Sequence, residues 1–322
     1  MKTNYLQGVL LCLVATVVWG TTFPLMTSVL RHIDPFTFTA MRYSIAGGAF
    51  LILLLNREGL AGLSLKGERV FLAWFLGSCG FAGFGFLVFL GQQLSGPTGA
   101  LSASIMMATM PMLGLLVNWA VRGVRPPLAS FLFILLSFCG VSLVLTRGDY
   151  AAVLAMPSNY APDFLIILGA LCWVIYTVGA SFFPAWSVYR YTTITTLLGM
   201  VTVFAVNIIL IAFDVITLPS ASTVLTVAPH LIYMALIAGF VGVLSWNMGN
   251  KIVTSMNGVL FMDVVPITTF IISAFTGVAP QREQIIGASL TASALIMNNL
   301  YQRYRVVRQN RLDALELAPD LE

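Results

Sequence analysis

Asp263 is a carboxylate inside an apolar stretch of sequence, where an ionisable side chain is costly and usually has a function. It is flanked by phenylalanine, methionine and valine, and it stands three residues before Pro266. Charged groups at such positions face a partner charge or a water-filled cavity. Two interpretations are open. Asp263 either acts in proton coupling or binds a substrate amine, or it pairs with Arg42 or Lys251 and only ties helices together.

Arg42 is a second charge within an apolar stretch, close to the end that follows Asp34 and Pro35. A guanidinium presents a planar fork of donors that matches a carboxylate, so Arg42 is a candidate contact for a substrate carboxylate. The other interpretation is that its long side chain extends to the membrane surface and binds no ligand. Its position within a turn or two of the end of the stretch favours that second interpretation.

Several aromatic side chains lie near the centres of apolar stretches, whereas interfacial tryptophans gather at the ends. Trp19 and Phe23, and likewise Trp173 and Tyr176, are spaced to share one face of a helix. Such residues predict an aromatic cavity for an apolar side chain or a cation, with a few polar groups to orient the ligand. The candidate substrate-binding residues are Trp19, Thr22, Phe23, Trp173, Tyr176, Trp246 and Asn247. The alternative is that these aromatics pack between helices or face lipid.

The composition indicates which elements position these residues. Hydrophobic residues make up 59% of the 322 residues and charged residues 9%, and the mean hydropathy is +0.94. Soluble domains carry about 25% charged residues, so most of the chain is predicted to lie in a membrane. The four cysteines lie within apolar stretches, which indicates buried small side chains rather than disulfides or metal ligands.

Ten stretches are apolar and long enough to cross a bilayer, for which a helix needs about 20 residues. They cover residues 6–30, 36–55, 70–92, 98–120, 128–146, 164–184, 191–213, 229–249, 255–277 and 284–301. Helix-ending residues such as Asp34-Pro35, Arg125-Pro126-Pro127 and Pro219 lie between them. We therefore predict an all-α membrane protein with ten transmembrane helices.

The basic residues predict the orientation, because loops rich in lysine and arginine stay in the cytoplasm. On the amino-terminal side lie Lys2, Arg57, Lys66, Arg69, Arg122, Arg125, Arg190, Lys251, Arg303, Arg305, Arg308 and Arg311. The opposite side has only Arg31, Arg147 and Arg282. Both termini are therefore predicted to be cytoplasmic. The same distribution argues against nucleic-acid binding, because the basic residues are spread over several loops.

Two segments indicate an internal repeat. Residues 98–111 and 254–266 both begin with threonine, continue through small, polar and apolar residues, and end with a proline, Pro111 or Pro266. Five stretches per half require the second half to enter the membrane from the opposite side. Many secondary transporters are such inverted repeats and bind substrate near the midplane between the halves. The two prolines are candidate hinges, because interior prolines kink helices.

Together these features predict two five-helix halves, residues 1–150 and 162–302, and a cytoplasmic tail, residues 303–322.

Several residues also resemble one family. They are Trp19-Gly20-Thr21-Thr22-Phe23, Arg42 after Asp34-Pro35, Pro111 and Pro266, and Gly140 and Gly287. With these marks the chain resembles the EamA-type branch of the drug/metabolite transporter superfamily over roughly residues 6–301. The resemblance implies ten helices in two inverted halves and transport without a cofactor. The Trp246-Asn247 pair is similar to what aromatic amino acid exporters of the superfamily carry there, which implies a metabolite exporter.

Other classes of protein are disfavoured. The chain lacks a phosphate-binding loop for ATP, and its two histidines, His32 and His230, lie near the ends of stretches. No metal site is expected, and a membrane-embedded enzyme is a minor alternative. A channel would need a polar stripe or a charged ring, and none is visible.

We therefore expect a secondary transporter in the inner cell membrane that exports a small metabolite, such as an amino acid, by alternating access. Its partners would be the substrate, the lipid bilayer and, for the coupling function of Asp263, protons. An exporter of hydrophobic or cationic drugs is the second candidate. The sequence leaves the substrate, the direction of transport, the coupling ion and the oligomeric state open.

Overall fold

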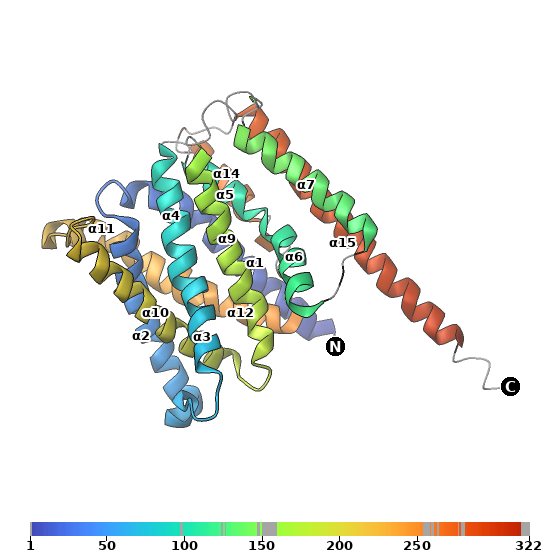
Figure 1. The fold of residues 1–322 in the computed structure, drawn as a ribbon, viewed down its shortest axis with the longest axis horizontal. Coiled ribbons are helices and arrows are strands. Elements are labelled where there is room, and N and C mark those ends of the chain that lie inside the picture. Colours follow the sequence, from blue (N-terminus) through green and yellow to red (C-terminus); the bar gives the residue numbers. More distant parts are fainter. Residues whose placement is uncertain are drawn as a thin grey trace.

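The computed structural model describes residues 2–96, 99–123, 125, 127–146, 149, 160–253, 258, 261–262, 264–275, 277 and 281–316, and every regular element within them is a helix (Figure 1). The all-α prediction is confirmed for this part of the chain. Asp263 and most of the predicted repeat segment 254–266 lie outside the described residues.

The helices of the first half follow the predicted stretches. They are α1 (Lys2–Val29), α2 (Pro35–Glu58), the 3₁₀ turn η1 (Gly59–Leu63), α3 (Val70–Gly77), the π-helical η2 (Ser78–Gly83), α4 (Phe84–Leu94), α5 (Gly99–Met107), α6 (Met110–Arg122) and α7 (Leu128–Thr146). Local signals set the bounds of α2. Asp34 Oδ1 accepts a hydrogen bond from the backbone N of Thr37 at 2.8 Å, and Gly59 ends the helix with φ of 64°.

The second half contains a corresponding series. It comprises α9 (Ala161–Gly179), the 3₁₀ turn η5 (Ala180–Phe182), α10 (Val188–Ala212), α11 (Ala221–Ile232), the π-helical η6 (Tyr233–Gly242), α12 (Val243–Val253), α14 (Val264–Phe275) and α15 (Arg282–Glu316). The hydroxyls of Ser187 and Ser220 cap α10 and α11. The helix α15 continues without a break past residue 303, where the tail was predicted to begin.

Six helices in the described residues are long and apolar enough to cross a membrane. They span Tyr5–Val29, Pro35–Leu63, Val70–Leu94, Ala161–Phe182, Val188–Ala212 and Ala221–Val253. A seventh crossing is formed if the bent pair α5 and α6 counts as one span. All ten predicted stretches overlap a described helix, and ten membrane crossings stay a prediction.

The pair α5 and α6 is bent by 42° where the two helices meet. Pro111 is the second residue of α6, where its missing N–H removes no bond within that helix. Pro266 is likewise the third residue of α14 as described. Pro111 therefore lies in a first helical turn, and not in a helix interior as the sequence suggested. Pro111 lies at a real change of direction, which is compatible with a hinge.

Helix α10 shows why the molecule needs lipid around it. Its buried face carries Thr192, Thr193, Thr195, Thr196 and Asn207, whereas large apolar side chains such as Val201, Phe204 and Ile208 are exposed. A soluble helix has the opposite arrangement. The polar groups are paired inside the bundle, as in the 2.6 Å bond from Thr196 Oγ1 to Thr192 O. The outer surface is therefore suited to hydrocarbon.

Helices of the two halves pack in matching pairs. The contact between α4 and α9 corresponds to the contact between α12 and α1. The contact of α3 and η2 with α10 corresponds to the contact of η6 with α2. Helix α6 contacts α9 as α14 contacts α1. The two π-helical segments, η2 and η6, interrupt corresponding spans, the third of each half. Helices α7 and α15 run side by side along one flank (Figure 1), where a Cβ on Gly140 would lie 2.6 Å from Gly287 O.

Polar contacts join loops at the two ends of the bundle. At one end Arg190 Nη2 lies 3.0 Å from Glu68 Oε1, and Lys251 Nζ donates to Trp186 O at 3.2 Å. At the other end Gln93 donates to Leu30 O at 3.0 Å. The loop with Lys66, the start of α10 with Arg190 and the end of α12 with Lys251 therefore share one end of the bundle, as the charge distribution predicted.

Candidate functional site

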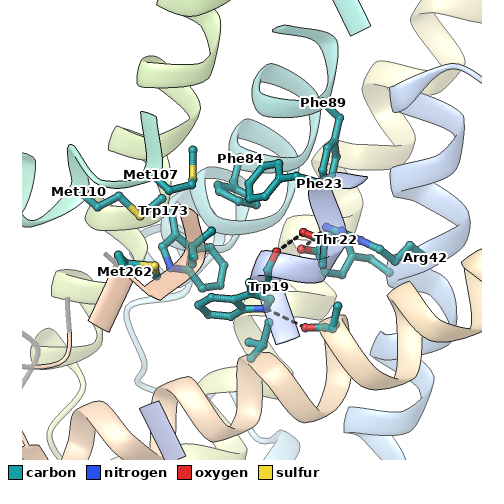
Figure 2. A pocket seen from close by; sticks show the side chains of 15 residues that line it. Trp19, Thr22, Phe23, Arg42, Phe84, Phe89, Met107, Met110, Trp173 and Met262 are labelled. Atoms are coloured by element: carbon teal, nitrogen blue, oxygen red, sulfur yellow. Dashed lines mark hydrogen bonds between the residues drawn. The ribbon is translucent and has the colours of Figure 1, made fainter. Parts of the chain in front are cut away.

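A small cavity lies at the centre of the bundle (Figure 2). Its lining comes from both halves of the chain: Trp19, Thr22, Phe23, Arg42, Tyr43, Phe84, Phe89, Met107, Met110, Trp173, Ala238, Gly239, Val243, Met262 and Val265. Its volume is about 30 Å³, enough for one or two water molecules, since about 10–15 Å³ holds one. A metabolite would have to expand it. The predicted residues Trp19, Thr22, Phe23, Arg42 and Trp173 all line this cavity.

The three predicted tryptophans meet in one cluster. The ring centroids of Trp19 and Trp173 lie 5.2 Å apart at an interplanar angle of 86°, and those of Trp19 and Trp246 lie 5.3 Å apart at 54°. Trp246 is fully buried and Trp173 is 3% exposed, so neither faces lipid. Such pairs contribute about 0.5–1.5 kcal/mol each beyond the burial of their area. The cluster therefore joins α1, α9 and α12 firmly.

Two hydrogen bonds fix the orientation of the cluster. Trp19 Nε1 donates to Ala238 O at 3.0 Å in the π-helical η6, and Trp246 Nε1 donates to Thr177 Oγ1 at 3.1 Å. A Cβ on Gly242 would lie 2.8 Å from Trp19 Nε1, so glycine is needed for this close approach. The rings are thus held by the polar groups of neighbouring helices.

Tyr176 and Asn247 belong to a buried polar network beside the cluster. Asn247 Nδ2 donates to Tyr176 Oη at 2.8 Å and to Thr192 Oγ1 at 2.9 Å. Tyr191 Oη donates to Tyr176 O at 2.7 Å. Neither Tyr176 nor Asn247 lines the central cavity. The candidate residues therefore separate into a cavity lining, a tryptophan cluster and this network.

Arg42 is enclosed by protein and does not extend to a membrane surface. It is 4% exposed, and its Nη2 donates to Tyr43 Oη at 2.6 Å. Its guanidinium carbon lies 4.3 Å from the ring centroid of Tyr43 and 5.2 Å from that of Phe89, distances at which a cation is attracted to a ring face. Its Nε has no hydrogen-bond partner. No carboxylate of the described residues forms an ion pair with it.

A second, larger cavity of about 650 Å³ lies beyond the cluster, and we term it the vestibule. It is lined by Asn118, Thr177, Val178, Ala180, Ser181, Phe183, Pro184, Trp186, Ser187, Val188, Tyr191, Asn247, Asn250 and Lys251. Residues 183–188 and Lys251 place its mouth at the end of the bundle that carries the basic loops. Its lining combines apolar side chains with hydroxyl and amide groups and one cation, Lys251, and includes no carboxylate of the described residues.

Sequence reasoning missed several lining residues for which a signal existed. Asn250 and Lys251 lie three and four residues after the predicted Asn247 on one apolar helix and so share its face. Met107 and Met110 flank the bend before Pro111, and methionine suits an adaptable binding surface. Asp263 lies outside the described residues, while Met262 and Val265 line the cavity.

Comparisons with known proteins agree with this architecture. A model of the EamA-like transporter family matches twice, over residues 6–146 and 161–300. The chain is 36% identical over 308 residues to the uncharacterized transporter YrdR of Bacillus subtilis (strain 168), covering 96% of each chain. It is 28% identical to the uncharacterized transporter YyaM of the same organism, over 86% of this chain and 90% of that one.

A solved crystal structure has a similar fold. It superposes with a TM-score of 0.65 at 22% identity, over 91% of this chain and 97% of the other. One family match falls on the helices α1 to α7 and the other on the helices α9 to α15. The chain therefore belongs to the EamA-like transporter family and is a membrane transporter.

Proposed function

We propose that this protein is a secondary transporter that moves a small metabolite, such as an amino acid, out of the cell by alternating access. The proposal rests mainly on the unequal cavities on the two sides of the tryptophan cluster. The vestibule has a volume of about 650 Å³, and the central cavity about 30 Å³. An alternating-access carrier exposes its midplane site to one side at a time. A wide vestibule at one end and a nearly collapsed site support such a state.

Two features support inverted five-helix halves as the moving parts. The helices pack in matching pairs across the halves, and both π-helical segments fall in the third span of a half. π-Helical turns are frequent at functional sites. The bend before Pro111 offers one place where a half changes shape.

The distribution of basic residues supports a cytoplasmic position for the mouth of the vestibule. Lys66, Arg190 and Lys251 lie at that end. Both termini would then be cytoplasmic and the protein would lie in the inner membrane. A metabolite would load from the vestibule, which fits export.

Counterflow in proteoliposomes tests the transport function. Liposomes that contain the purified protein and a preloaded mixture of unlabelled amino acids are expected to accumulate labelled amino acid transiently and saturably. Saturation is expected because a carrier turns over through one site. Liposomes without protein serve as the control. A current that rises linearly with voltage would indicate a channel and would overturn the proposal.

An exporter of cationic drugs is the second candidate, and the aromatic cavity favours it. Ring faces attract cations, and Trp19 and Trp173 both line the cavity. The described linings of both cavities, however, carry Arg42 and Lys251 and no carboxylate. Preloading the same liposomes with tetraphenylphosphonium separates the candidates, because only a drug exporter would exchange it.

Asp263 remains the proposed proton-coupling group. A carboxylate in an apolar span changes its charge as it binds and releases a proton, which links its occupancy to pH. Asp263→Asn cannot release a proton, so the variant should lose the pH dependence of transport that the wild type shows. Uptake is measured across imposed pH gradients. Asp163→Asn, in the first turn of α9, is the control, and equal pH dependence in wild type and Asp263→Asn would contradict the coupling role.

A further inference from the structure

We infer that the transported molecule is a small carboxylate with an apolar body, whose anionic group is bound first by Lys251 in the vestibule and then by Arg42 in the central cavity. This inference rests on the proposed transport function and adds the substrate class and the order of contacts. It is carried by two cationic side chains in the linings of two cavities, with the tryptophan cluster between the cavities.

Arg42 has the properties of an anion-binding residue and forms no ion pair with a carboxylate of the described residues. Its side chain is 4% exposed, and its one hydrogen bond within the described part of the chain is to Tyr43 Oη. The unpartnered Nε leaves one edge of the guanidinium open to a new acceptor. A buried charge without a counterion is costly, and the rings of Tyr43 and Phe89 offset only part of that cost. A substrate carboxylate would complete the arrangement through charge-assisted hydrogen bonds.

Lys251 provides the corresponding cation in the vestibule. Its ammonium contacts the carbonyl oxygen of Trp186 at 3.2 Å and forms no ion pair with the described residues. The acids at the same end of the bundle are engaged elsewhere. Glu68 pairs with Arg190, and Glu58 accepts a hydrogen bond from Ser187. Lys251 is therefore available to an anion that enters the vestibule.

The vestibule wall offers a second donor next to this ammonium. Trp186 lines the vestibule, is 3% exposed, and its indole Nε1 has no acceptor. The amide side chains of Asn247 and Asn250 lie along the same helix as Lys251. Their amide nitrogens already donate within the protein and Asn250 Oδ1 has no partner, so it is the ammonium of Lys251, with no carboxylate among the described lining residues, that favours an anion.

The side chains between Lys251 and Arg42 indicate that the substrate has an apolar body. A molecule that passes from the vestibule to the cavity must move past Trp19, Trp173 and Trp246, and it then contacts Met107 and Met110. Their ring faces and thioethers bind apolar groups, and the indole Nε1 of Trp173, which has no acceptor, is one donor among them. The anionic group is therefore recognised at the cations and the remainder by rings and thioethers.

Three probes with one phenyl body separate the charges. They are 3-phenylpropanoate, which carries only the carboxylate, phenethylamine, which carries only the ammonium, and phenylalanine, which carries both. We expect the first and third to raise the melting temperature of the purified wild-type protein and to inhibit counterflow, and phenethylamine to do neither. A shift by phenethylamine alone would overturn the inference while leaving the transport function intact. Absence of any counterflow in the wild type would instead overturn the transport function.

Variants test the two cations separately. Arg42→Gln should weaken 3-phenylpropanoate binding roughly tenfold to a hundredfold, since hydrogen bonds to charged groups are lost, and Arg42→Lys should retain part of the binding. Lys251→Gln should raise the KM of counterflow more than it lowers the maximal rate, and Lys251→Arg should rescue it. Lys66→Gln, an exposed cation outside both linings, is the control. An unchanged KM in Lys251→Gln would show that Lys251 does not bind the substrate.

A purely structural role for Arg42 makes a different prediction. If Arg42 only pairs with Asp263, the double variant Arg42→Gln/Asp263→Asn would regain the thermal stability that Arg42→Gln loses, as coupled partners do. The inference requires that the double variant still fails to bind 3-phenylpropanoate. Recovered binding in the double variant would overturn it.

Discussion

Gly77→Ala is expected to destabilise the protein strongly, because a single added methyl group would meet backbone. A Cβ at Gly77 would overlap the carbonyl oxygen of Thr195 and lie 3.0 Å from the backbone N of Gly199. A Cβ at Gly199 would in turn overlap the carbonyl oxygen of Gly77. Backbone atoms cannot rotate away as a side chain can, so α3 and α10 would have to separate.

The separation would be costly at this crossing in particular. Directly after Gly77, Ser78 Oγ is hydrogen-bonded at 2.6 Å to Thr202 Oγ1 of α10. Small residues let membrane helices approach closely, and packing supplies much of their association energy. Overpacking costs about 1–3 kcal/mol where side chains can adjust, and Gly77→Ala should reach the upper end of that range. The melting temperature of the purified variant measures the effect.

Gly48→Ala is the matched control in α2. Gly48 is exposed, and a Cβ there would meet nothing within 4 Å. Alanine favours a helix over glycine by about 0.8–1.0 kcal/mol, so this variant should melt at or slightly above the wild-type temperature. Equal melting temperatures for Gly77→Ala and Gly48→Ala would show that α3 and α10 do not touch as described.

Much of the fold could be predicted from the sequence, because the bilayer imposes a simple rule on it. A long apolar stretch must be a helix so that its backbone groups are paired, and Asp34, Ser187 and Ser220 mark helix starts by their capping oxygens. The π-helical turns in η2 and η6 could not be predicted. They depend on close contacts such as Gly80 on Tyr176 and Gly242 on Trp19, which form only when distant helices meet.

The candidate site was predictable in part, for a similar reason. Position near the middle of a span was enough to suggest that Trp19, Trp173 and Trp246 meet, and they do. The side of the cluster on which a residue lies was not predictable. Thr177 lies four residues beyond Trp173, about 6 Å along the helix axis, and this rise is enough to move it from the central cavity to the vestibule.

The burial of Arg42 could not be predicted from its position in the span. Its place near the end of a span suggested a side chain that reaches the membrane surface. Its enclosure depends on Phe89 of α4, which is remote in sequence and packs beside the guanidinium. Depth along a helix therefore does not reveal which neighbours cover a side chain.

Trp246→Ala is expected to destabilise the protein and also to connect the two cavities. Trp246 is fully buried, packs against Trp19, and is bonded through its Nε1 to Thr177 in the vestibule wall. Loss of a buried aromatic side chain costs about 3–5 kcal/mol when it leaves a cavity. The cavity left here would lie between the central cavity and the vestibule. Water and small reagents would then reach Thr22 and its neighbours from the vestibule without any movement of the halves.

Thiol labelling measures this access directly. Thr22→Cys, in a background without the four natural cysteines, places a thiol in the lining of the central cavity. A membrane-impermeant maleimide applied at the vestibule end should label it slowly when Trp246 is present and rapidly in Trp246→Ala. Trp246→Phe keeps a ring at the cluster and should preserve slow labelling while it removes only the bond to Thr177.

The control for a general loss of stability is Trp119→Ala in α6. Trp119 is 36% exposed and packs on Phe131, so its removal deletes an indole ring from outside both cavity linings. If Trp246→Ala labels no faster than Trp119→Ala, the cluster is not the barrier between the cavities. If only Trp246→Ala labels rapidly, the barrier that an alternating carrier must open at each cycle contains the Trp246 ring, and substrate reaches Arg42 only when that ring moves.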